Sequence, residues 1–206
     1  MKKVALLAYY LIFIASYSLT AANPETGMPK GKIGITYSSF GNNDVVSNQE
    51  LMGGASYYGD KFNTFGLTYL YQLNRTFDIE TGIEYSDQKI RIVPMVYPGM
   101  NSSPSSAKIS LINFPVSMRI NFLNYFFVSG GIFLGIDTGP SSPVDRQNGI
   151  GGNLGVGLRY NFKCGAAVFV NPYSKFHALV PFSSDGHPYH ILESGYRFGL
   201  LFKLNQ

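Results

Sequence analysis

The C-terminal segment alternates between two kinds of side chain, and this alternation limits what the chain can fold into. One parity is apolar and consists of Tyr196, Phe198, Leu200, Phe202 and Leu204, whereas the other contains Arg197, Gly199 and Lys203. Successive side chains of a β-strand point to opposite faces of the sheet. Such a strand places one face in lipid and the other in a polar interior, which is typical of a transmembrane barrel.

Eight segments of this kind predict an all-β, eight-stranded antiparallel up-and-down transmembrane β-barrel. They are separated by short turns at Asn74–Arg75, Leu123–Asn124 and Phe162–Gly165, and by longer polar connections that contain Gly41–Asp44, 94–107 and 138–148 or end near Tyr189. This alternation of turns and loops is typical of a barrel with both termini in the periplasm. The parity of the seventh segment, about 166–175, is ambiguous. A soluble sandwich or lipocalin-like barrel is the alternative, but it would bury the apolar parity.

The N-terminus has the pattern of a secretory signal peptide. A basic start precedes an apolar stretch from Val4 to about Ala15, and small residues before position 23 offer a cleavage site. An anchoring helix is the alternative, but the apolar stretch is shorter than the roughly 20 residues that span a bilayer. We therefore expect a signal peptide at 1–22 and one outer membrane barrel domain at 23–206, located in the bacterial outer membrane.

Charge, cysteine and glycine content argue against several function classes. The formal net charge of +4 includes two leader lysines, so it is too small to suggest nucleic acid as a partner. The single cysteine, Cys164, cannot form an internal disulfide, and we expect it in a turn. Gly149–Gly152 fail the dinucleotide-binding pattern, because Leu154 occupies the place of the third glycine and no helix is expected to follow. We expect no cofactor and no metal.

Two local motifs suggest a family. They are the Asn113-Phe114-Pro115-Val116 stretch and the Gly-x-Gly-x-x-Tyr pattern at Gly155, Gly157 and Tyr160. With the leader and the eight hairpin-connected segments, the chain resembles the outer membrane protein β-barrel domain family, the PorT-like and OmpX-like small barrels. The resemblance implies the fold and leaves room for a role as an accessory subunit of a secretion or assembly complex.

The chain departs from this family pattern in two ways. It ends Leu204-Asn205-Gln206 rather than on the aromatic residue typical of barrel assembly signals. Pro115 removes a ladder donor in a fold without edges, which predicts a β-bulge there.

Charged side chains on the inward parity form the first candidate site. They are Glu80, Glu84, Arg119, Arg159 and Arg197. Counted from the short turns, Glu80, Arg119 and Arg159 should lie at a similar depth near the periplasmic end. Opposite charges in a narrow lumen pair, so the cluster is either a structural plug or a gated, proton-conducting path. We expect the plug, because side chains just fill an eight-stranded barrel.

Three histidines form the second candidate site, in and beside the last long loop. They are His177, His187 and His190, and Ser183, Ser184, Asp185 and Glu193 lie nearby in the sequence. A Ser, a His and an acid could hydrolyse a lipid bond. No nucleophile motif of fixed spacing is present, and loops are commonly rich in these residues. We expect no catalytic residue and no enzymatic activity. A lipid A-modifying enzyme and a narrow channel are the alternative functions.

Two long loops are more apolar than a freely solvated surface needs. Their apolar side chains include Met95, Tyr97 and Met100 in the second loop and Phe176, Leu179 and Phe182 in the fourth. Either the strands extend beyond the bilayer or these loops contact a partner. We expect a structural or interaction component of the envelope. Its partners would be outer membrane lipid and lipopolysaccharide and, through the long loops, other envelope proteins.

Overall fold

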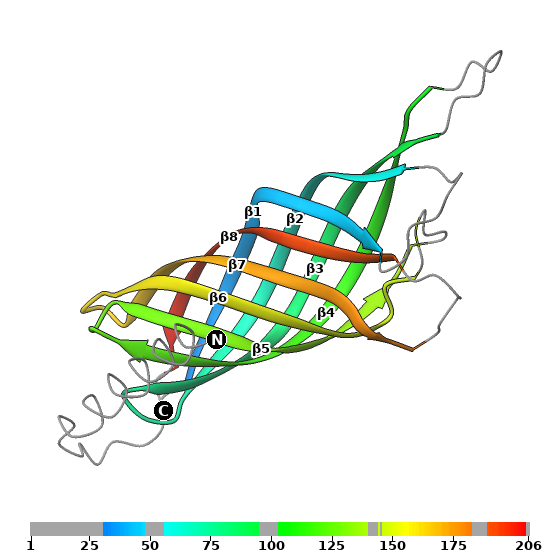
Figure 1. Cartoon of the computed structure of the whole chain (residues 1–206). Coiled ribbons are helices and arrows are strands. Elements are labelled where there is room, and N and C mark those ends of the chain that lie inside the picture. Colours follow the sequence, from blue (N-terminus) through cyan, green and yellow to red (C-terminus); the bar gives the residue numbers. More distant parts are fainter. Residues whose placement is uncertain are drawn as a thin grey trace, which may run out of the picture.

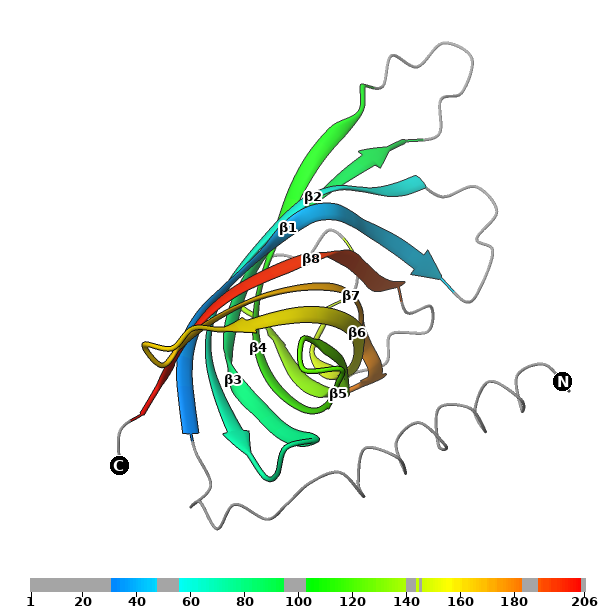
Figure 2. The same cartoon turned by 90° about the vertical axis from the view of Figure 1, so that its left-hand side faces the viewer.

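Eight antiparallel strands form one closed sheet in which each strand pairs with the next and the last pairs with the first (Figures 1 and 2). The computed structural model describes residues 31–47, 56–94, 103–139, 144, 146–182 and 189–204. The strands are β1 (Gly31–Ser47), β2 (Ser56–Gln72), β3 (Phe77–Val93), β4 (Ser105–Phe122), β5 (Phe126–Asp137), β6 (Gly149–Asn161), β7 (Ala166–Pro181) and β8 (Tyr189–Lys203). The predicted all-β, eight-stranded up-and-down barrel is confirmed. The predicted signal peptide lies outside the described residues.

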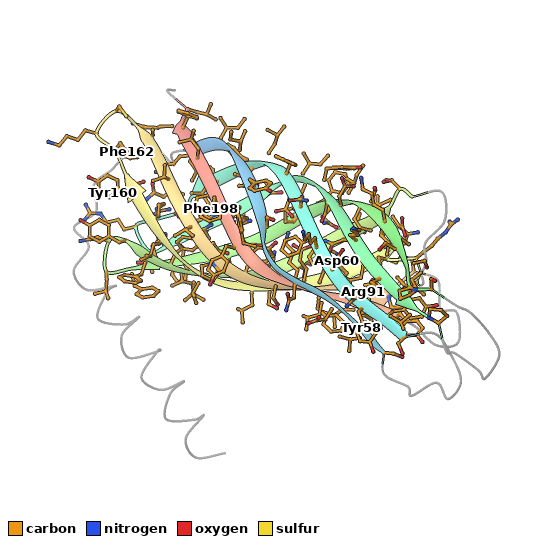
Figure 3. The ribbon with its side chains drawn as sticks, turned by 90° about the horizontal axis from the view of Figure 1, so that it is seen from above. Tyr58, Asp60, Arg91, Tyr160, Phe162 and Phe198 are labelled. Carbon is orange, nitrogen blue, oxygen red and sulfur yellow. The ribbon has the colours of Figure 1, made fainter. Side chains whose placement is uncertain are left out.

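The apolar parity of the strands faces outward. On β4, Val116 and Met118 are 54% and 48% exposed, whereas Ser117 and Arg119 between and beside them are buried. Figure 3 shows side chains around the barrel along its whole length, from Tyr160 and Phe162 at one end to Tyr58 and Arg91 at the other. A soluble barrel would bury this parity, so the surface is that of a transmembrane barrel of the outer-membrane type. No helix within the described ranges has the length and apolarity to cross a membrane.

Short turns gather at one end of the barrel, beside the start of β1 and the end of β8. The Asn74 side chain accepts hydrogen bonds from the backbone of Thr76 and Phe77 at 2.8 Å each, which fixes the first turn. In the second turn, Leu123 and Asn124 both adopt left-handed backbone angles, with φ of 49° and 62°. These angles suit the tight connection of two twisted strands. This end is therefore the periplasmic end.

The predicted loop at Gly41–Asp44 is wrong, because these residues continue β1. The pairing of β1 with β8 shifts register between Ser39 and Asn42, and Phe40 adopts a left-handed φ of 59°. Beyond this irregularity the buried Asn43 side chain donates to the carbonyls of Lys61 and Lys89 at 3.4 and 3.1 Å. The segment Gly41–Asp44 has the composition of a loop but belongs to β1. It can do so because the inward side-chain amide of Asn43 bonds to the backbones of β2 and β3.

The predicted bulge at Pro115 is also wrong. The register of β3 against β4 is the same on both sides of the proline, with Thr81 opposite Val116 and Glu84 opposite Asn113. The missing backbone donor is accommodated by a local gap in the ladder, and the Thr81 hydroxyl donates to the Pro115 carbonyl at 3.0 Å.

Three inward aromatic rings each lie directly opposite a glycine of the next strand. The pairs are Phe127 with Gly157, Phe133 with Gly151 and Phe169 with Gly199. A Cβ atom added at these glycines would lie 2.0 to 2.3 Å from the opposing ring. The glycines therefore give the rings room to lie flat across the wall, which packs the lumen without widening the barrel.

We expect Gly199→Ala to lower the free energy of unfolding by about 1–3 kcal/mol, the usual cost of overpacking. The added methyl group would displace Phe169, whose Cε1 atom lies 2.0 Å from the place that the new Cβ atom would occupy. The matched control is Gly130→Ala on β5, where the nearest atom is 3.4 Å away. Urea unfolding followed by circular dichroism compares the two variants. Equal stability of both would contradict the packing described here.

Candidate functional site in the barrel lumen

Two apolar clusters close the lumen near its two ends. The cluster near the short turns consists of Leu70, Phe127, Ala167, Phe169 and Leu201. The cluster at the opposite end consists of Ile90, Ile109, Leu111, Val144 and Ile191, with Val45, Tyr57 and Tyr189 packed against it. Charged side chains occupy the space between and beside these clusters.

Part of the connection between β5 and β6 folds into the lumen at the second cluster. Val144 is 6% exposed and belongs to that cluster. The buried Gln147 side chain donates to the carbonyl of Tyr189 at 2.7 Å and accepts from the backbone of Ile191 at 3.3 Å. These bonds attach the end of the connection to β8.

Glu80 is the centre of the buried charges. Arg119 donates from Nε to its carboxylate at 2.5 Å, and Arg197 lies 3.2 Å from the other oxygen. The Thr68 hydroxyl donates to the same carboxylate at 3.0 Å. Partners from β2, β4 and β8 thus converge on one acid of β3, so this single side chain connects four strands.

The Arg119 guanidinium lies between two aromatic rings. Its central carbon is 4.6 Å from the Phe127 centroid and 4.4 Å from the Phe169 centroid. A guanidinium that cannot reach water is stabilised by the negative faces of such rings. The apolar cluster near the short turns and the charged layer above it are therefore one packed unit.

A second group of ion pairs extends the charged layer toward the opposite end. Glu84 pairs with Lys175, and Arg197 lies 3.6 Å from the same carboxylate. Glu193 accepts hydrogen bonds from Gln88 and Tyr173. All of these side chains are buried, with Tyr173 the most exposed of them at 9%. The acids and bases contact one another across the lumen.

A separate ion pair lies nearer the periplasmic end. Arg159 donates to Asp78 at 2.8 Å, and Asn121 donates to the same oxygen at 2.9 Å. Arg159 therefore pairs with Asp78 rather than with Glu80. We define the lumen network as the acids Asp78, Glu80, Glu84 and Glu193 with the bases Arg119, Arg159, Lys175 and Arg197.

The structure brings together four of the five charged residues that the sequence nominated, Glu80, Glu84, Arg119 and Arg197. Sequence reasoning missed Lys175 and the inward position of Glu193. The signal was available in β7, where Phe169, Asn171, Tyr173 and Lys175 share one buried parity. Pro172 and the mixture of apolar and polar residues obscured that parity.

The predicted position in and beside the last long loop is wrong for His177, whereas His190 lies beside that connection, at the start of β8, as predicted. His177 lies in β7 and is fully buried, with its ring 5.0 Å from Phe133 and its Nε2 3.5 Å from Glu193. His190 lies in β8, 5.4 Å from the ring of Phe176. His187 and the nearby residues 183–185 lie outside the described residues. His177 is thus a lumen side chain packed away from lipid and water.

The apolar residues assigned to the fourth loop are mostly part of a strand. Phe176 and Leu179 lie in β7, which continues to Pro181, and Phe182 follows it directly. Leu179 and Phe182 are 55% and 62% exposed. Met95, Tyr97 and Met100 lie outside the described residues. The apolar residues near the end of β7 are therefore explained by a longer strand. Contact with a partner protein stays a prediction, because none of these positions tests it.

No protein-family model and no curated protein match the chain. Among solved structures, the chain is similar to the outer membrane protein OprG from Pseudomonas aeruginosa, with 14% identity over 86% of this chain and 97% of that chain and a TM-score of 0.43. The outer membrane protein AlkL is 12% identical over 90% and 95%, with a TM-score of 0.47. Ail from Yersinia pestis is 14% identical over 85% and 99%, with a TM-score of 0.35.

Proposed function

We propose that the protein is a non-enzymatic integral barrel of the bacterial outer membrane, closed to ions, that acts as a structural or interaction component of the envelope. The observation that carries this proposal is the filled lumen. Three acids pair with four bases inside it, the fourth acid, Glu193, accepts hydrogen bonds from Gln88 and Tyr173, and apolar clusters lie near both ends. An open channel of this size would need a continuous polar path, whereas a barrel of eight strands is readily filled by its own side chains.

The position of the histidines supports the non-enzymatic part of the proposal. A general base needs a nucleophile within hydrogen-bond reach and a substrate that can approach it. His177 is fully buried between Phe133 and Glu193, so a lipid in the membrane has no access to its ring. His190 packs against the ring of Phe176.

The length of the strands supports an interaction role. β3 and β4 continue past the apolar belt to Val93 and Ser105, and this hairpin projects from the end opposite the short turns (Figures 1 and 2). Strands that continue outside the bilayer offer a surface to other envelope proteins. The role of an accessory subunit in a secretion or assembly complex, which the resemblance to PorT-like barrels implies, belongs to this proposal.

We expect the purified protein to give no open-pore current in planar lipid bilayers, because the packed lumen leaves no water-filled path. Heat-modifiable migration of the same preparation shows that the barrel is folded. The matched variant is Phe127→Ala/Phe169→Ala, which removes both rings from the cluster near the short turns and should raise the leak current if it folds. Discrete current steps from the wild-type protein would favour a narrow channel instead. A change in lipid A mass on expression would favour the enzyme.

A further inference from the structure

Three lysines lie side by side on the outer face of neighbouring strands. Lys61 of β2 is directly opposite Lys89 of β3, and Lys89 is directly opposite Lys108 of β4. Arg91 lies one outward position further along β3, beside the ring of Tyr58. All four cations are exposed. We call them the cationic patch. Like charges directly opposite one another destabilise a sheet, so this arrangement favours an anionic ligand.

Neighbouring carboxylates neutralise only half of the cationic patch. Asp60 lies 3.2 Å from Lys89, and Asp87 lies 2.9 Å from Lys108. Among the described residues, Lys61 and Arg91 have no ion pair. Two positive charges therefore remain for a ligand on this side of the barrel.

The cationic patch lies just beyond the lipid-facing surface. Each lysine lies four residues from an outward apolar side chain of its own strand, on the side away from the short turns. These apolar side chains are Phe65 on β2, Tyr85 on β3 and Ile112 on β4. Four residues span about 13 Å along a strand, or about 10 Å along the membrane normal at the usual tilt. Lysine side chains are long enough to reach back toward the bilayer. The charges are thus placed at the level of lipid headgroups in the outer leaflet.

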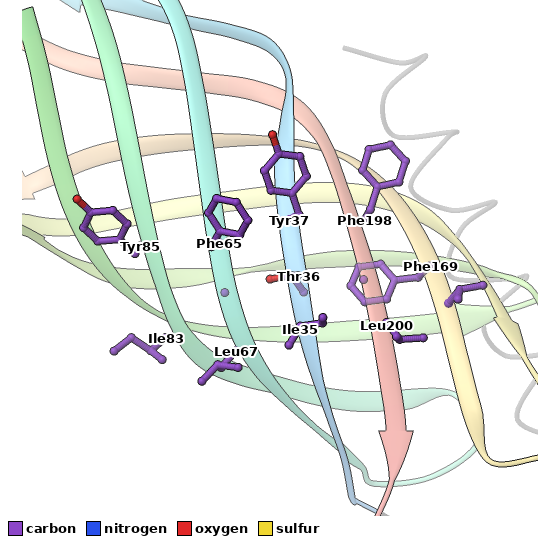
Figure 4. Close-up of a pocket in the computed structure, with 13 residues that line it drawn as sticks. Ile35, Thr36, Tyr37, Phe65, Leu67, Ile83, Tyr85, Phe169, Phe198 and Leu200 are labelled. Carbon is purple, nitrogen blue, oxygen red and sulfur yellow. The ribbon is translucent and has the colours of Figure 1, made fainter.

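A groove of about 760 Å³ lies below the cationic patch and is lined by residues of β1, β2, β3, β7 and β8. Figure 4 shows its two walls. The upper wall is a row of aromatic rings, Tyr85, Phe65, Tyr37 and Phe198, and the lower wall is a row of aliphatic side chains, Ile83, Leu67, Ile35 and Leu200. Gly66 and Gly199, which belong to the inward parity, line its floor with backbone atoms. The volume is in the range of small-molecule sites.

We infer that the cationic patch and the groove together bind one molecule of lipid A, the phosphate-bearing, multiply acylated lipid of the outer leaflet. The phosphates lie against Lys61 and Arg91, and one acyl chain lies between the aromatic and aliphatic rows. A lipid that carries both negative charge and several chains matches both features, whereas a zwitterionic lipid matches only the groove. This inference rests on the proposed outer membrane function and assigns the place of the lipid contact.

The test measures lipid A retained by the purified full-length barrel, using native mass spectrometry from detergent. We expect one lipid A per wild-type barrel and a roughly 30-fold weaker affinity for Lys61→Gln/Arg91→Gln, since each cation near an anionic membrane surface contributes about 1 kcal/mol. The control Lys163→Gln/Lys203→Gln removes two exposed cations at the periplasmic end and should leave binding unchanged. Equal loss in both double variants would overturn the site.

A second pair of variants tests the groove. Leu67→Phe fills it and should weaken lipid A binding, whereas Val156→Phe makes a similar change on the outer face of β6 and should not. Equal binding by the two variants would overturn the groove as the acyl site.

Dephosphorylated lipid A should bind weakly to the wild type. Competition by inorganic phosphate at equal concentration would overturn a lipid as the occupant.

The same samples separate this inference from the proposed function. A heat-stable barrel that retains no lipid A refutes the lipid site alone. A chain that forms no heat-stable barrel refutes the membrane barrel itself.

Discussion

We expect Glu80→Gln to lower the free energy of unfolding by about 3–5 kcal/mol, the usual cost of removing one partner from a buried ion pair. The carboxylate accepts from Arg119 and Thr68 and lies 3.2 Å from Arg197, all in the closed lumen. The neutral amide would leave one positive charge in excess and place an N–H group against a guanidinium. The chain has no tryptophan, so urea unfolding in lipid vesicles is best followed by circular dichroism.

The control for this prediction lies on the same strand. Asp87→Asn also removes a carboxylate from an ion pair, but Asp87 faces outward and pairs with the exposed Lys108, so we expect a change of about 0–1 kcal/mol. Glu80→Gln/Arg119→Met restores the charge balance and should recover part of the loss, because Arg197 keeps Glu84 as a partner. Equal effects of the two single substitutions would refute a structural role for the network.

We expect Val116→Arg to impair assembly and to cost about 2–4 kcal/mol, since its side chain faces lipid in the middle of the apolar belt. Ser110→Arg is the matched control on the same face of β4. It lies beyond the belt beside Asp87, where an arginine costs about 0–1 kcal/mol. Heat-modifiable migration measures the folded fraction of each variant. If both fold equally well, the outward face does not contact lipid.

The alternation of side chains was sufficient to predict which face of β2, β3, β4, β6 and β8 meets the membrane. Period-two patterns are local, and lipid imposes one kind of side chain on the whole outer face. The inward charges of β3, β4 and β8 followed from the same parity. Sequence periodicity therefore carries most of the information in a fold whose two faces are so different.

The partners of those charges could not be predicted in the same way. Glu84 pairs with Lys175, which is 91 positions away, and the pairing depends on the curvature of the whole wall. The end of β1 and the last residues of β7 were missed because irregular backbone disguises them. Phe40 and Ala178 adopt left-handed angles there, with φ of 59° and 49°, and each breaks the simple alternation.

The lumen network divides unequally between the two halves of the chain. Strands β1–β4 contribute Asp78, Glu80, Glu84 and one base, Arg119, whereas β5–β8 contribute Arg159, Lys175, Arg197 and one acid, Glu193.

Before β1 and β8 meet, the lumen network is therefore divided into a mainly negative group on β3 and β4 and a mainly positive group on β6–β8. In the low dielectric of a membrane these two groups attract one another strongly, and neither group is neutral alone. Barrel closure cancels this separation of charge, so the ion pairs guide the two edges of the sheet toward each other as well as filling the interior.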